Sequence, residues 1–128
     1  SDVYKRQVFI ASRNVPAPGP GASAYSVAKA GLTQLARVAS LELGSYGVRV
    51  NVLHPDCVYD TGLWSDDVLQ GRAEKYGMSV EAYKSRNILK KEVTSREVAE
   101  MVAAVAGPVF LKTTGAQIPI DGGNDRVI

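Results

Sequence analysis

Apolar and polar residues along the chain alternate between short strand-like runs and longer helical stripes. Val8–Ser12 is a short apolar run rich in β-forming residues, which indicates a strand covered on both faces. Gly47–Pro55 alternates apolar and polar residues and is rich in valine, which predicts a second strand closed by proline. Between them, Ser23 is a candidate N-cap, and apolar residues recur at spacings of three and four up to Gly44 or Gly47. The apolar positions of this predicted helix are Ala28, Leu32, Leu35, Ala36, Ala39 and Leu43.

The second half of the chain continues this alternation. Asp66–Tyr76 and Ser79–Arg86 predict two short polar helices split at a glycine, which we expect to lie over a site. Ser95–Gly107 predicts a further helix with Ser95 as its cap. The stretch "GAQIPIDGG", residues 115–123, predicts a last short strand that ends in a glycine turn.

This order of elements predicts the α/β class, with a doubly wound parallel sheet and helices on both of its faces. The expected strands are fewer than a sheet normally has, so residues 8–128 are expected to be the C-terminal part of one larger domain. Residues 1–7, "SDVYKRQ", have no apolar period and are interpreted as a non-native or disordered leader outside the fold.

Composition excludes several classes of function. The 128 residues carry a net charge of only +2 with scattered basic residues, which argues against a nucleic-acid or membrane partner. No apolar run is long enough to span a bilayer. Cys57 is the single cysteine, so an internal disulfide is excluded and a reducing compartment, the cytoplasm, is expected.

Tyr25 and Lys29 are the first candidates for chemistry. They stand four residues apart near the start of the predicted helix and therefore share one face. A lysine ammonium and the positive end of a helix both favour the phenolate form of a tyrosine, so the pair can exchange a proton. The spacing alone more often describes a tyrosine packed at a helix start with a solvated lysine one turn further on. Because Ser12 ends the first strand, we expect all three side chains to meet in one crevice at the carboxyl end of the sheet.

Other candidate residues follow the second strand. His54 and Cys57 are too few to hold a metal ion, so no metal site is expected and His54 is interpreted as a packed side chain. Tyr59 and Trp64 could line a substrate pocket or pack within a lid, and both readings stay open. Residues 121–123, "DGG", are interpreted as a turn.

Four blocks in order carry a resemblance to a known family. Ser12, then "YSVAK" at residues 25–29, "GVRVNVLHP" and "TTGAQIPIDGG" resemble the C-terminal half of a short-chain dehydrogenase/reductase. The resemblance extends over 8–128. It implies a seven-stranded Rossmann sheet of which this chain holds the last three strands, with the glycine-rich dinucleotide loop upstream. The glycines before "YSVAK" then serve only to turn the chain.

The resemblance also implies roles for the three polar residues. Tyr25 would be the general acid/base of hydride transfer at a carbinol or carbonyl carbon. Ser12 would hydrogen-bond the substrate oxygen. Lys29 would favour the Tyr25 phenolate and, together with Tyr25, bind the nicotinamide ribose of NAD or NADP.

The end of the second strand both matches the family and departs from it. Pro55 and Val58 match residues expected to contact the cofactor. Asp56 stands where the family usually has glycine, and it too is expected at the cofactor. Asp60 occupies the place of a threonine that binds the nicotinamide amide, with Thr61 one place later.

Longer segments resemble a particular branch of the family. Three segments are similar to the dehydrogenase domain of bifunctional rhamnulose-1-phosphate aldolase/alcohol (lactaldehyde) dehydrogenases: "PDCVYDTGLW", "RAEKYGMSVEAYKSRNILKKEV" and "TTGAQIPIDGGNDRVI". This implies a small-molecule substrate such as lactaldehyde, in rhamnose catabolism, with an upstream aldolase domain and a homo-oligomeric parent. The alternatives are a sorbitol-6-phosphate dehydrogenase-like or 3-oxoacyl reductase-like enzyme, or a non-catalytic nucleotide-binding module. We expect the chain alone to lack dehydrogenase activity.

Overall fold

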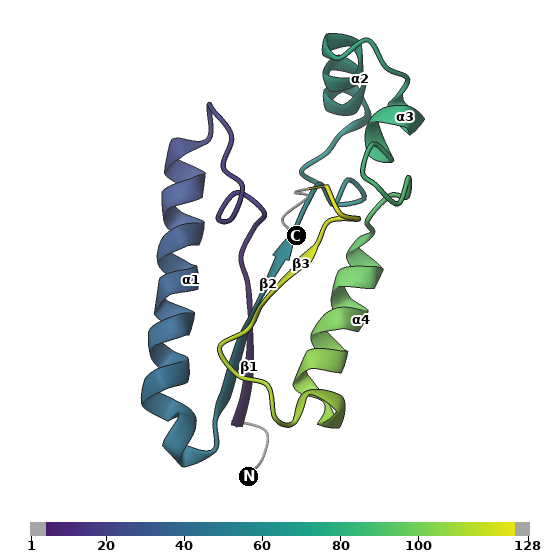
Figure 1. The fold of residues 1–128 in the computed structure, drawn as a ribbon. Helices are drawn as coiled ribbons and strands as arrows, with labels where there is room; N and C mark the ends of the chain where they lie inside the picture. Colours follow the sequence, from purple (N-terminus) through teal and green to yellow (C-terminus); the bar gives the residue numbers. More distant parts are fainter. Residues whose placement is uncertain (1–4, 125–128) are drawn as a thin grey trace.

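The computed structural model describes residues 5–124 and shows a small sheet flanked by helices (Figure 1). The strands are β1 (Arg6–Ile10), β2 (Arg49–Pro55) and β3 (Gln117–Ile120). The helices are α1 (Ser23–Leu43), α2 (Asp66–Lys75), α3 (Val80–Lys84) and α4 (Ser95–Ala106), with short 3₁₀ turns η2 (Gly44–Tyr46) and η3 (Pro108–Phe110).

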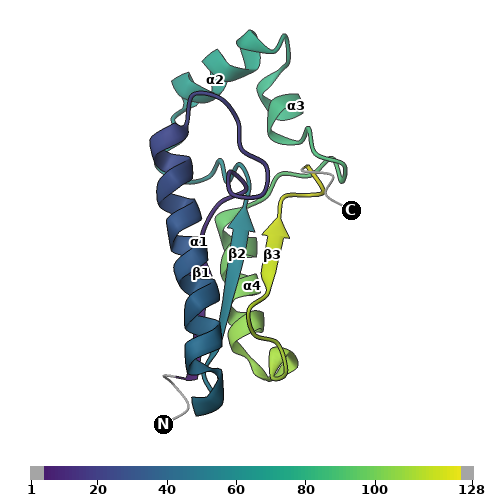
Figure 2. The same cartoon turned by 60° about the vertical axis from the view of Figure 1, so that its left-hand side comes forward.

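All three described strands are parallel, in the order β1-β2-β3. Phe9 lies opposite Val52, and Leu53 lies opposite Ile118. Helix α1 covers one face of the sheet and α4 covers the other (Figures 1 and 2). The predicted α/β class with parallel strands and helices on both faces is therefore confirmed.

The central strand β2 forms the middle of the core. Val50 and Val52 are at most 2% exposed and pack with Ala11 and Ala36, which joins α1 to the sheet. The polar residues Asn51 and His54 of β2 are buried as well, so β2 is covered on both faces although its sequence alternates apolar and polar residues. The core therefore fixes α1 against β2 and the end of β1.

The segment between β2 and α4 has an apolar cluster of its own. Tyr59, Leu69, Ala73 and Tyr83 are buried together there. Helices α2 and α3 lie beyond the carboxyl ends of the strands, at the top of Figure 2. Gly77, in the left-handed conformation with φ of 65°, separates the two helices as the sequence predicted.

The helix starts correct two expectations. Ser23 is the first residue of α1, and the N-cap is Ala22, which makes no side-chain capping bond. Thr94, and not Ser95, caps α4: its hydroxyl accepts from the Glu97 amide at 3.2 Å. The Glu97 carboxylate accepts from the Thr94 amide at 2.9 Å, which completes a capping box. These hydrogen bonds to the Thr94 backbone and hydroxyl lower the pKa of Glu97.

The start of β1 and the end of α1 can be compared with the boundaries that the sequence predicted. Strand β1 begins at Arg6, two residues before the predicted start, and Arg6 and Gln7 pair with Arg49 and Val50. These two residues of the expected leader therefore belong to the sheet, while residues 1–4 lie outside the described part of the chain. After α1 and η2, Gly47 takes the left-handed conformation with φ of 76°, which confirms one of the two predicted stops.

Much of the apolar surface of α1 faces away from the sheet. Thr33 and Ala36 are its buried residues, whereas Leu35, which the stripe predicted as buried, is 58% exposed. Val27 and Leu41 are exposed as well. The sheet touches only a narrow face of α1, so the rest of its apolar surface stays uncovered in this chain. Within residues 5–124, none of the helices combines the length and hydropathy needed to cross a membrane.

Arg49 ties the sheet to the end of α4. Its guanidinium donates to the carbonyl oxygens of Val105 at 2.9 Å and of Ala106 and Gly107 at 3.3 Å. The last carbonyls of a helix lack partners within the helix and carry a partial negative charge. Arg49 therefore neutralises the end of α4 while it holds the start of β2.

Candidate active site

The candidate site lies where β1 and β2 end and α1 begins. Beyond β1, the Ala11 amide donates to the Leu53 carbonyl at 2.8 Å and the Arg13 amide donates to the Pro55 carbonyl at 3.1 Å. The pairing of the two strands thus continues past Ser12 on both sides. Ser12 is held rigidly at the carboxyl end of the sheet, where parallel α/β sheets bind ligands.

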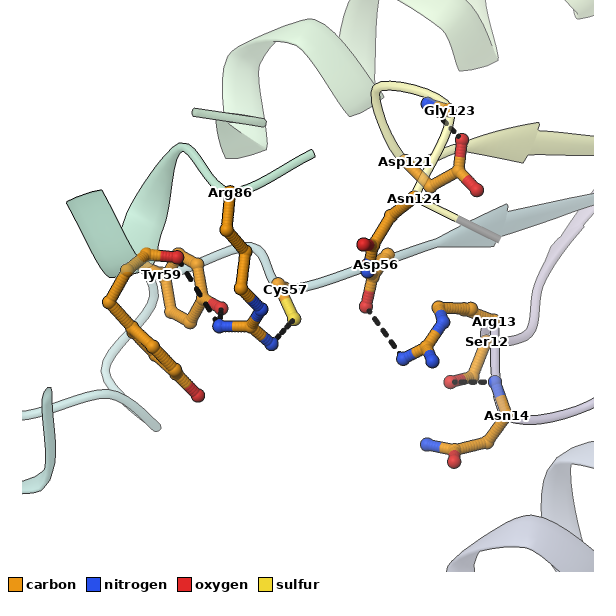
Figure 3. Close-up of polar contacts among 11 residues, drawn as sticks. Ser12, Arg13, Asn14, Asp56, Cys57, Tyr59, Arg86, Asp121, Gly123 and Asn124 are labelled. Atoms are coloured by element: carbon orange, nitrogen blue, oxygen red, sulfur yellow. Dashed lines mark hydrogen bonds and ion pairs between the residues drawn. The ribbon is translucent and has the colours of Figure 1, made fainter. Parts of the chain in front are cut away.

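Ser12 is buried, and its hydroxyl oxygen accepts a hydrogen bond from the Asn14 amide at 3.1 Å (Figure 3). Within the described residues, the Ser12 hydroxyl donates to no acceptor. Because its oxygen is already held as an acceptor, its hydrogen can be donated to a ligand oxygen. This suits the predicted contact with a substrate oxygen.

Tyr25 and Lys29 lie side by side on the first turns of α1. The Lys29 ammonium nitrogen lies 5.9 Å from the centre of the Tyr25 ring. It also donates to the Ile10 carbonyl at 3.0 Å, which fixes it against the end of β1. Tyr25 is 49% exposed. The shared face that the spacing predicted is present, and the tyrosine ring is accessible to a ligand.

A second contact ties the start of α1 to the loop after β1. The Ser26 hydroxyl donates to the Asn14 carbonyl at 3.2 Å. Lys29 and Ser26 thus connect one turn of α1 to the residues on either side of Ser12. No hydrogen bond within residues 5–124 joins Ser12 to Tyr25 directly, and both are connected to the same turn between β1 and α1.

Asp56 connects the ends of all three strands (Figure 3). Its amide donates to the Ile120 carbonyl at 3.1 Å. Its carboxylate lies 3.6 Å from the Arg13 guanidinium and accepts from the Asn124 side chain. Asp56, a residue predicted at the cofactor, therefore has a carboxylate that is occupied by contacts within the chain. Pro55, the last residue of β2, lies at the same edge of the sheet.

The residues that follow Asp56 build the neighbouring segment. Val58 pairs with Val93 in an isolated parallel bridge. The Asp60 carboxylate accepts from the Ser95 amide at 3.0 Å and from the Ser95 hydroxyl at 3.0 Å. Asp60 thus anchors the start of α4, and the Thr61 hydroxyl donates to the Val58 carbonyl at 3.2 Å. Both side chains that could stand in for the family's threonine have partners within the chain.

Tyr59 and Trp64 pack against each other. Their ring centres are 4.8 Å apart at an angle of 77°, and Tyr59 is 3% exposed. This edge-to-face contact belongs to the apolar cluster between β2 and α4. Both rings therefore pack within the segment that covers the strand ends, as one of the two interpretations predicted. Tyr59 also borders a small cavity.

His54 is a packed side chain at the end of β2. It is 2% exposed, and its Nε2 atom lies 3.1 Å from the Gln117 side-chain oxygen. Its Nδ1 atom has no partner among the described residues. No group of three or more His, Cys, Asp or Glu side chains in the part of the chain that the structure describes is arranged to hold a metal ion.

The turn after β3 confirms the reading of residues 121–123. The Gly123 amide donates to the Asp121 carboxylate at 2.8 Å, and the Asn124 amide donates to the Asp121 carbonyl at 3.1 Å. Gly122 has a φ of 62°, which favours glycine, and the Leu89 amide donates to its carbonyl at 3.1 Å. The turn carries Asn124 to Asp56 and so contributes to the network of strand ends.

Arg86 is a residue that the sequence reading missed. Its guanidinium donates to the Tyr59 hydroxyl and the Tyr83 carbonyl, both at 3.2 Å, and lies 4.1 Å from the centre of the Tyr83 ring. A further N–H points to the Cys57 sulfur at 3.8 Å. Periodicity gives no signal for Arg86, because its contacts depend on how a segment 29 residues away in sequence folds back.

The pKa values of Cys57, Tyr59 and Arg86 leave these three side chains with one positive charge, on Arg86. Burial, followed by the nearby Asp56 charge, raises the pKa of Cys57 to about 11. Burial, reinforced by the hydrogen bond to Cys57, also raises the pKa of Tyr59. Burial by itself would lower the pKa of Arg86, but the contacts with Tyr83, Tyr59 and Cys57 raise it overall. At neutral pH the thiol and phenol are therefore neutral, and Arg86 is charged.

Comparison with known proteins agrees with this geometry. A family model described as "Enoyl-(Acyl carrier protein) reductase" matches residues 6–125. The oxidoreductase YuxG of Bacillus subtilis is 38% identical over 121 residues, which cover 91% of this chain and 18% of YuxG. The 2,3-dihydro-2,3-dihydroxybenzoate dehydrogenase of Escherichia coli is 35% identical over 91% of this chain and 48% of its own length.

Solved structures show the same fold. A short-chain dehydrogenase family protein from Francisella tularensis superimposes with a TM-score of 0.79 at 29% identity, over 95% of this chain and 51% of that protein. An actinorhodin polyketide ketoreductase solved with NADPH superimposes with a TM-score of 0.77 at 29% identity, over 94% of this chain and 47% of the reductase.

The matching family model, the parallel sheet and the Ser, Tyr and Lys residues at its carboxyl edge define the class: the chain belongs to the short-chain dehydrogenase/reductase family. The chain spans about half the length of the solved relatives it matches and less of YuxG.

Proposed function

We propose that this chain is the acid/base half of an NAD(P)-dependent dehydrogenase or reductase, with Tyr25 exchanging the proton. The accessible phenol beside the Lys29 ammonium is the observation that carries this proposal. Hydride transfer to a carbonyl builds negative charge on its oxygen, and a positioned acid that supplies a proton relieves it. Among the described residues the Ser12 hydroxyl has no acceptor, so its hydrogen can be donated to the same oxygen.

NAD or NADP would supply or accept the hydride. Lys29 has three N–H donors, of which one is used by the Ile10 carbonyl, so the others can bind the hydroxyls of a ribose. The exposed Tyr25 hydroxyl is a suitable neighbour for the same ring. We propose that the segment of Pro55, Asp56 and Val58 contacts the nicotinamide through its backbone, because the Asp56 carboxylate is already occupied.

The proposed substrate is a small alcohol or hydroxyaldehyde such as lactaldehyde, in rhamnose catabolism. Two observations support it. Residues 55–64, before α2, residues 72–93, from the end of α2 through α3, and the C-terminal residues 113–128 resemble the lactaldehyde-linked branch of the family. YuxG, of which this chain covers only 18%, is several times longer than the chain, as a protein fused to an aldolase domain would be.

The parent protein is proposed to be a cytoplasmic homo-oligomer. Val27, Leu35 and Leu41 on α1 are 58% exposed or more, which leaves apolar surface for the upstream half of the domain or a second copy. Cys57 is a free cysteine, as is usual in a reducing compartment.

The test is a substrate comparison with the full-length protein. NAD(P)H absorbance would be followed with lactaldehyde, sorbitol 6-phosphate and a 3-oxoacyl thioester, each with both cofactors. We expect kcat/KM for lactaldehyde to exceed the others by about tenfold or more. A preference for one of the other two substrates would overturn the substrate proposal. Tight NAD(H) binding without turnover of any of the three substrates would favour the non-catalytic module.

A further inference from the structure

Asp56 brings a buried carboxylate to the strand ends, at a position where the resemblance to the family leads us to expect glycine. The residue is 7% exposed, and a buried carboxylate is unfavourable unless charged or hydrogen-bonding partners surround it. The Arg13 guanidinium lies 3.6 Å from this carboxylate, and the Asn124 side chain donates to it. The carboxylate therefore joins the residues that follow β1 and β3 to the end of β2 (Figure 3).

Arg13 connects this carboxylate to the candidate catalytic residues. It directly follows Ser12, and its amide continues the pairing with β2 by donating to the Pro55 carbonyl at 3.1 Å. The chain then leaves the sheet in a turn, in which the Val15 amide donates to the Ser12 carbonyl at 3.0 Å. The ion pair with Asp56 therefore holds the side chain of a residue from which this turn starts.

The turn after Arg13 sets the direction of the Ser12 hydroxyl. The Asn14 amide donates to the Ser12 hydroxyl oxygen at 3.1 Å, so the position of Asn14 determines how the hydroxyl is oriented. The Ser26 hydroxyl of α1 donates to the Asn14 carbonyl at 3.2 Å. Asp56 holds the same turn from the side of β2, through Arg13. The Ser12 hydroxyl is thus supported both from α1 and from β2.

The backbone around Asp56 is itself tightly determined. Cys57, the next residue, has a φ of 52°, a left-handed conformation that is unfavourable for residues other than glycine. Such strain persists where the surrounding contacts determine the backbone. The Asp56 amide donates to the Ile120 carbonyl at 3.1 Å, and Val58 pairs with Val93. Asp56 therefore belongs to a well-anchored segment, as a residue that positions another requires.

The ion pair also makes the Asp56 charge compatible with the proposed chemistry. Hydride transfer to a carbonyl builds negative charge on the substrate oxygen. An unpaired carboxylate close to this oxygen would oppose that charge. The Arg13 guanidinium offsets it, so Asp56 can hold the turn without opposing the reaction.

We propose that Asp56 is a positioning residue, whose ion pair with Arg13 holds the Ser12 hydroxyl where the substrate oxygen binds. The inference rests on the proposed function in taking Ser12 as the donor to that oxygen. A small displacement of a group that stabilises the transition state lowers the rate strongly. Loss of the ion pair should therefore reduce turnover although it removes no group that touches the substrate.

The first experiment tests whether the turn depends on Asp56. In the full-length protein, Asp56→Asn keeps the shape of the side chain and removes its charge. Hydrogen–deuterium exchange would be followed by mass spectrometry on peptides that contain residues 13 and 14. Exchange of these amides should become about tenfold faster in the variant. Glu92→Gln is the matched control, because it removes an ion pair of similar length, 3.8 Å to Lys84, and should leave this exchange unchanged.

The second experiment tests whether Asp56 acts through Ser12. Turnover would be measured with whichever of lactaldehyde, sorbitol 6-phosphate and the 3-oxoacyl thioester the full-length protein uses best. Asp56→Asn should lower kcat about tenfold in the unmodified protein, but less than about twofold in a Ser12→Ala background, because an absent hydroxyl cannot be misplaced. Titration with NAD(P)H gives the number of binding sites, so that kcat is expressed per site. The dissociation constant of the cofactor should change by less than about twofold.

Two variants of Arg13 examine the same ion pair from its other side. Arg13→Gln removes the positive charge and should lower kcat about as much as Asp56→Asn. Arg13→Lys keeps the charge, and because the Arg13–Asp56 contact joins single atoms at 3.6 Å, it should retain at least about a third of kcat. Glu92→Gln should leave kcat unchanged. If Asp56→Asn does not fold, the two Arg13 variants decide the question.

Three results would overturn the proposal. The first is unchanged exchange or unchanged kcat in Asp56→Asn. The second is an equal loss of kcat with and without the Ser12 hydroxyl, which would assign Asp56 a purely structural role. The third is a loss of cofactor affinity as large as the loss of turnover, which would place the Asp56 side chain at the cofactor. If none of the three substrates is turned over, the proposed function fails, and the exchange experiment by itself decides whether Asp56 holds the Ser12 turn.

Discussion

Replacing Gly122 by alanine should lower the free energy of unfolding by more than the cost of placing alanine in a left-handed backbone. Gly122 has a φ of 62°, and a Cβ atom there would overlap the side-chain amide group of Asn87. Asn87 cannot turn away freely, because its side chain donates to the Lys91 carbonyl at 2.6 Å and accepts from the Lys91 amide at 3.2 Å. The clash must therefore move the turn or break these bonds.

The magnitude follows from two contributions. Left-handed backbone costs a non-glycine residue about 1 kcal/mol, and overpacking in a tight contact costs about 1–3 kcal/mol. Gly122→Ala should thus lower the free energy of unfolding by about 2–4 kcal/mol. Gly77→Ala separates the two contributions, since Gly77 has a φ of 65° but a Cβ atom there would meet nothing within 4 Å. It should cost about 1 kcal/mol.

Urea denaturation followed by circular dichroism measures all three proteins. A double variant adds Asn87→Ala, which removes the clashing atoms, and in that background Gly122→Ala should cost only about 1 kcal/mol. The reasoning is refuted if Gly122→Ala costs no more than Gly77→Ala, or if removing the Asn87 side chain leaves its cost unchanged.

Three further predictions concern contacts away from the catalytic residues. Arg49→Met should lower the free energy of unfolding by about 2 kcal/mol in urea denaturation, because three carbonyls at the end of α4 lose a charged donor. The control variant, Arg37→Met at an exposed position, should change the free energy of unfolding by under about 0.5 kcal/mol. Equal effects of the two variants would contradict the capping role of Arg49. Thr94→Ala should cost about 1 kcal/mol in the same assay by breaking the capping box, and no loss would show that the box is not needed. Cys57 has a pKa of about 11 in the fold against an ordinary 9.0, so its contribution to stability is present below pH 9.0 and is lost as the pH rises toward 11. At about pH 8 iodoacetamide should alkylate it about a hundredfold more slowly than in urea, and equal rates would contradict the shift.

The sequence predicted the order of elements well because each depends on local signals. Valine-rich β2, the apolar spacing of α4 and the glycines at positions 47 and 77 all behave as their local chemistry requires. The cap of α4 was misassigned although the signal was present: Thr94 has glutamate three residues later, whereas Ser95 does not.

The less predictable part of the site depends on contacts between distant segments. Asp56 was expected to contact the cofactor from its place after β2. That contact stays a prediction, and the structure adds that the Asp56 carboxylate is held by Arg13 and Asn124, which follow the other two strands. No pattern within one segment reveals such a network, because it exists only once three strands are side by side. Arg86 was missed for the same reason.

The central claim is that the Tyr25 hydroxyl transfers the proton during hydride transfer. Its most direct test is the turnover number of a Tyr25→Phe variant of the full-length protein, with Tyr46→Phe as control, since Tyr46 is an exposed tyrosine in η2 at the other end of α1. A positioned proton donor contributes about 10²–10⁴ in rate, so kcat should fall by at least about a hundredfold in the first variant and stay unchanged in the second. A Tyr25→Phe protein whose kcat remains within a few-fold of the original would contradict the account.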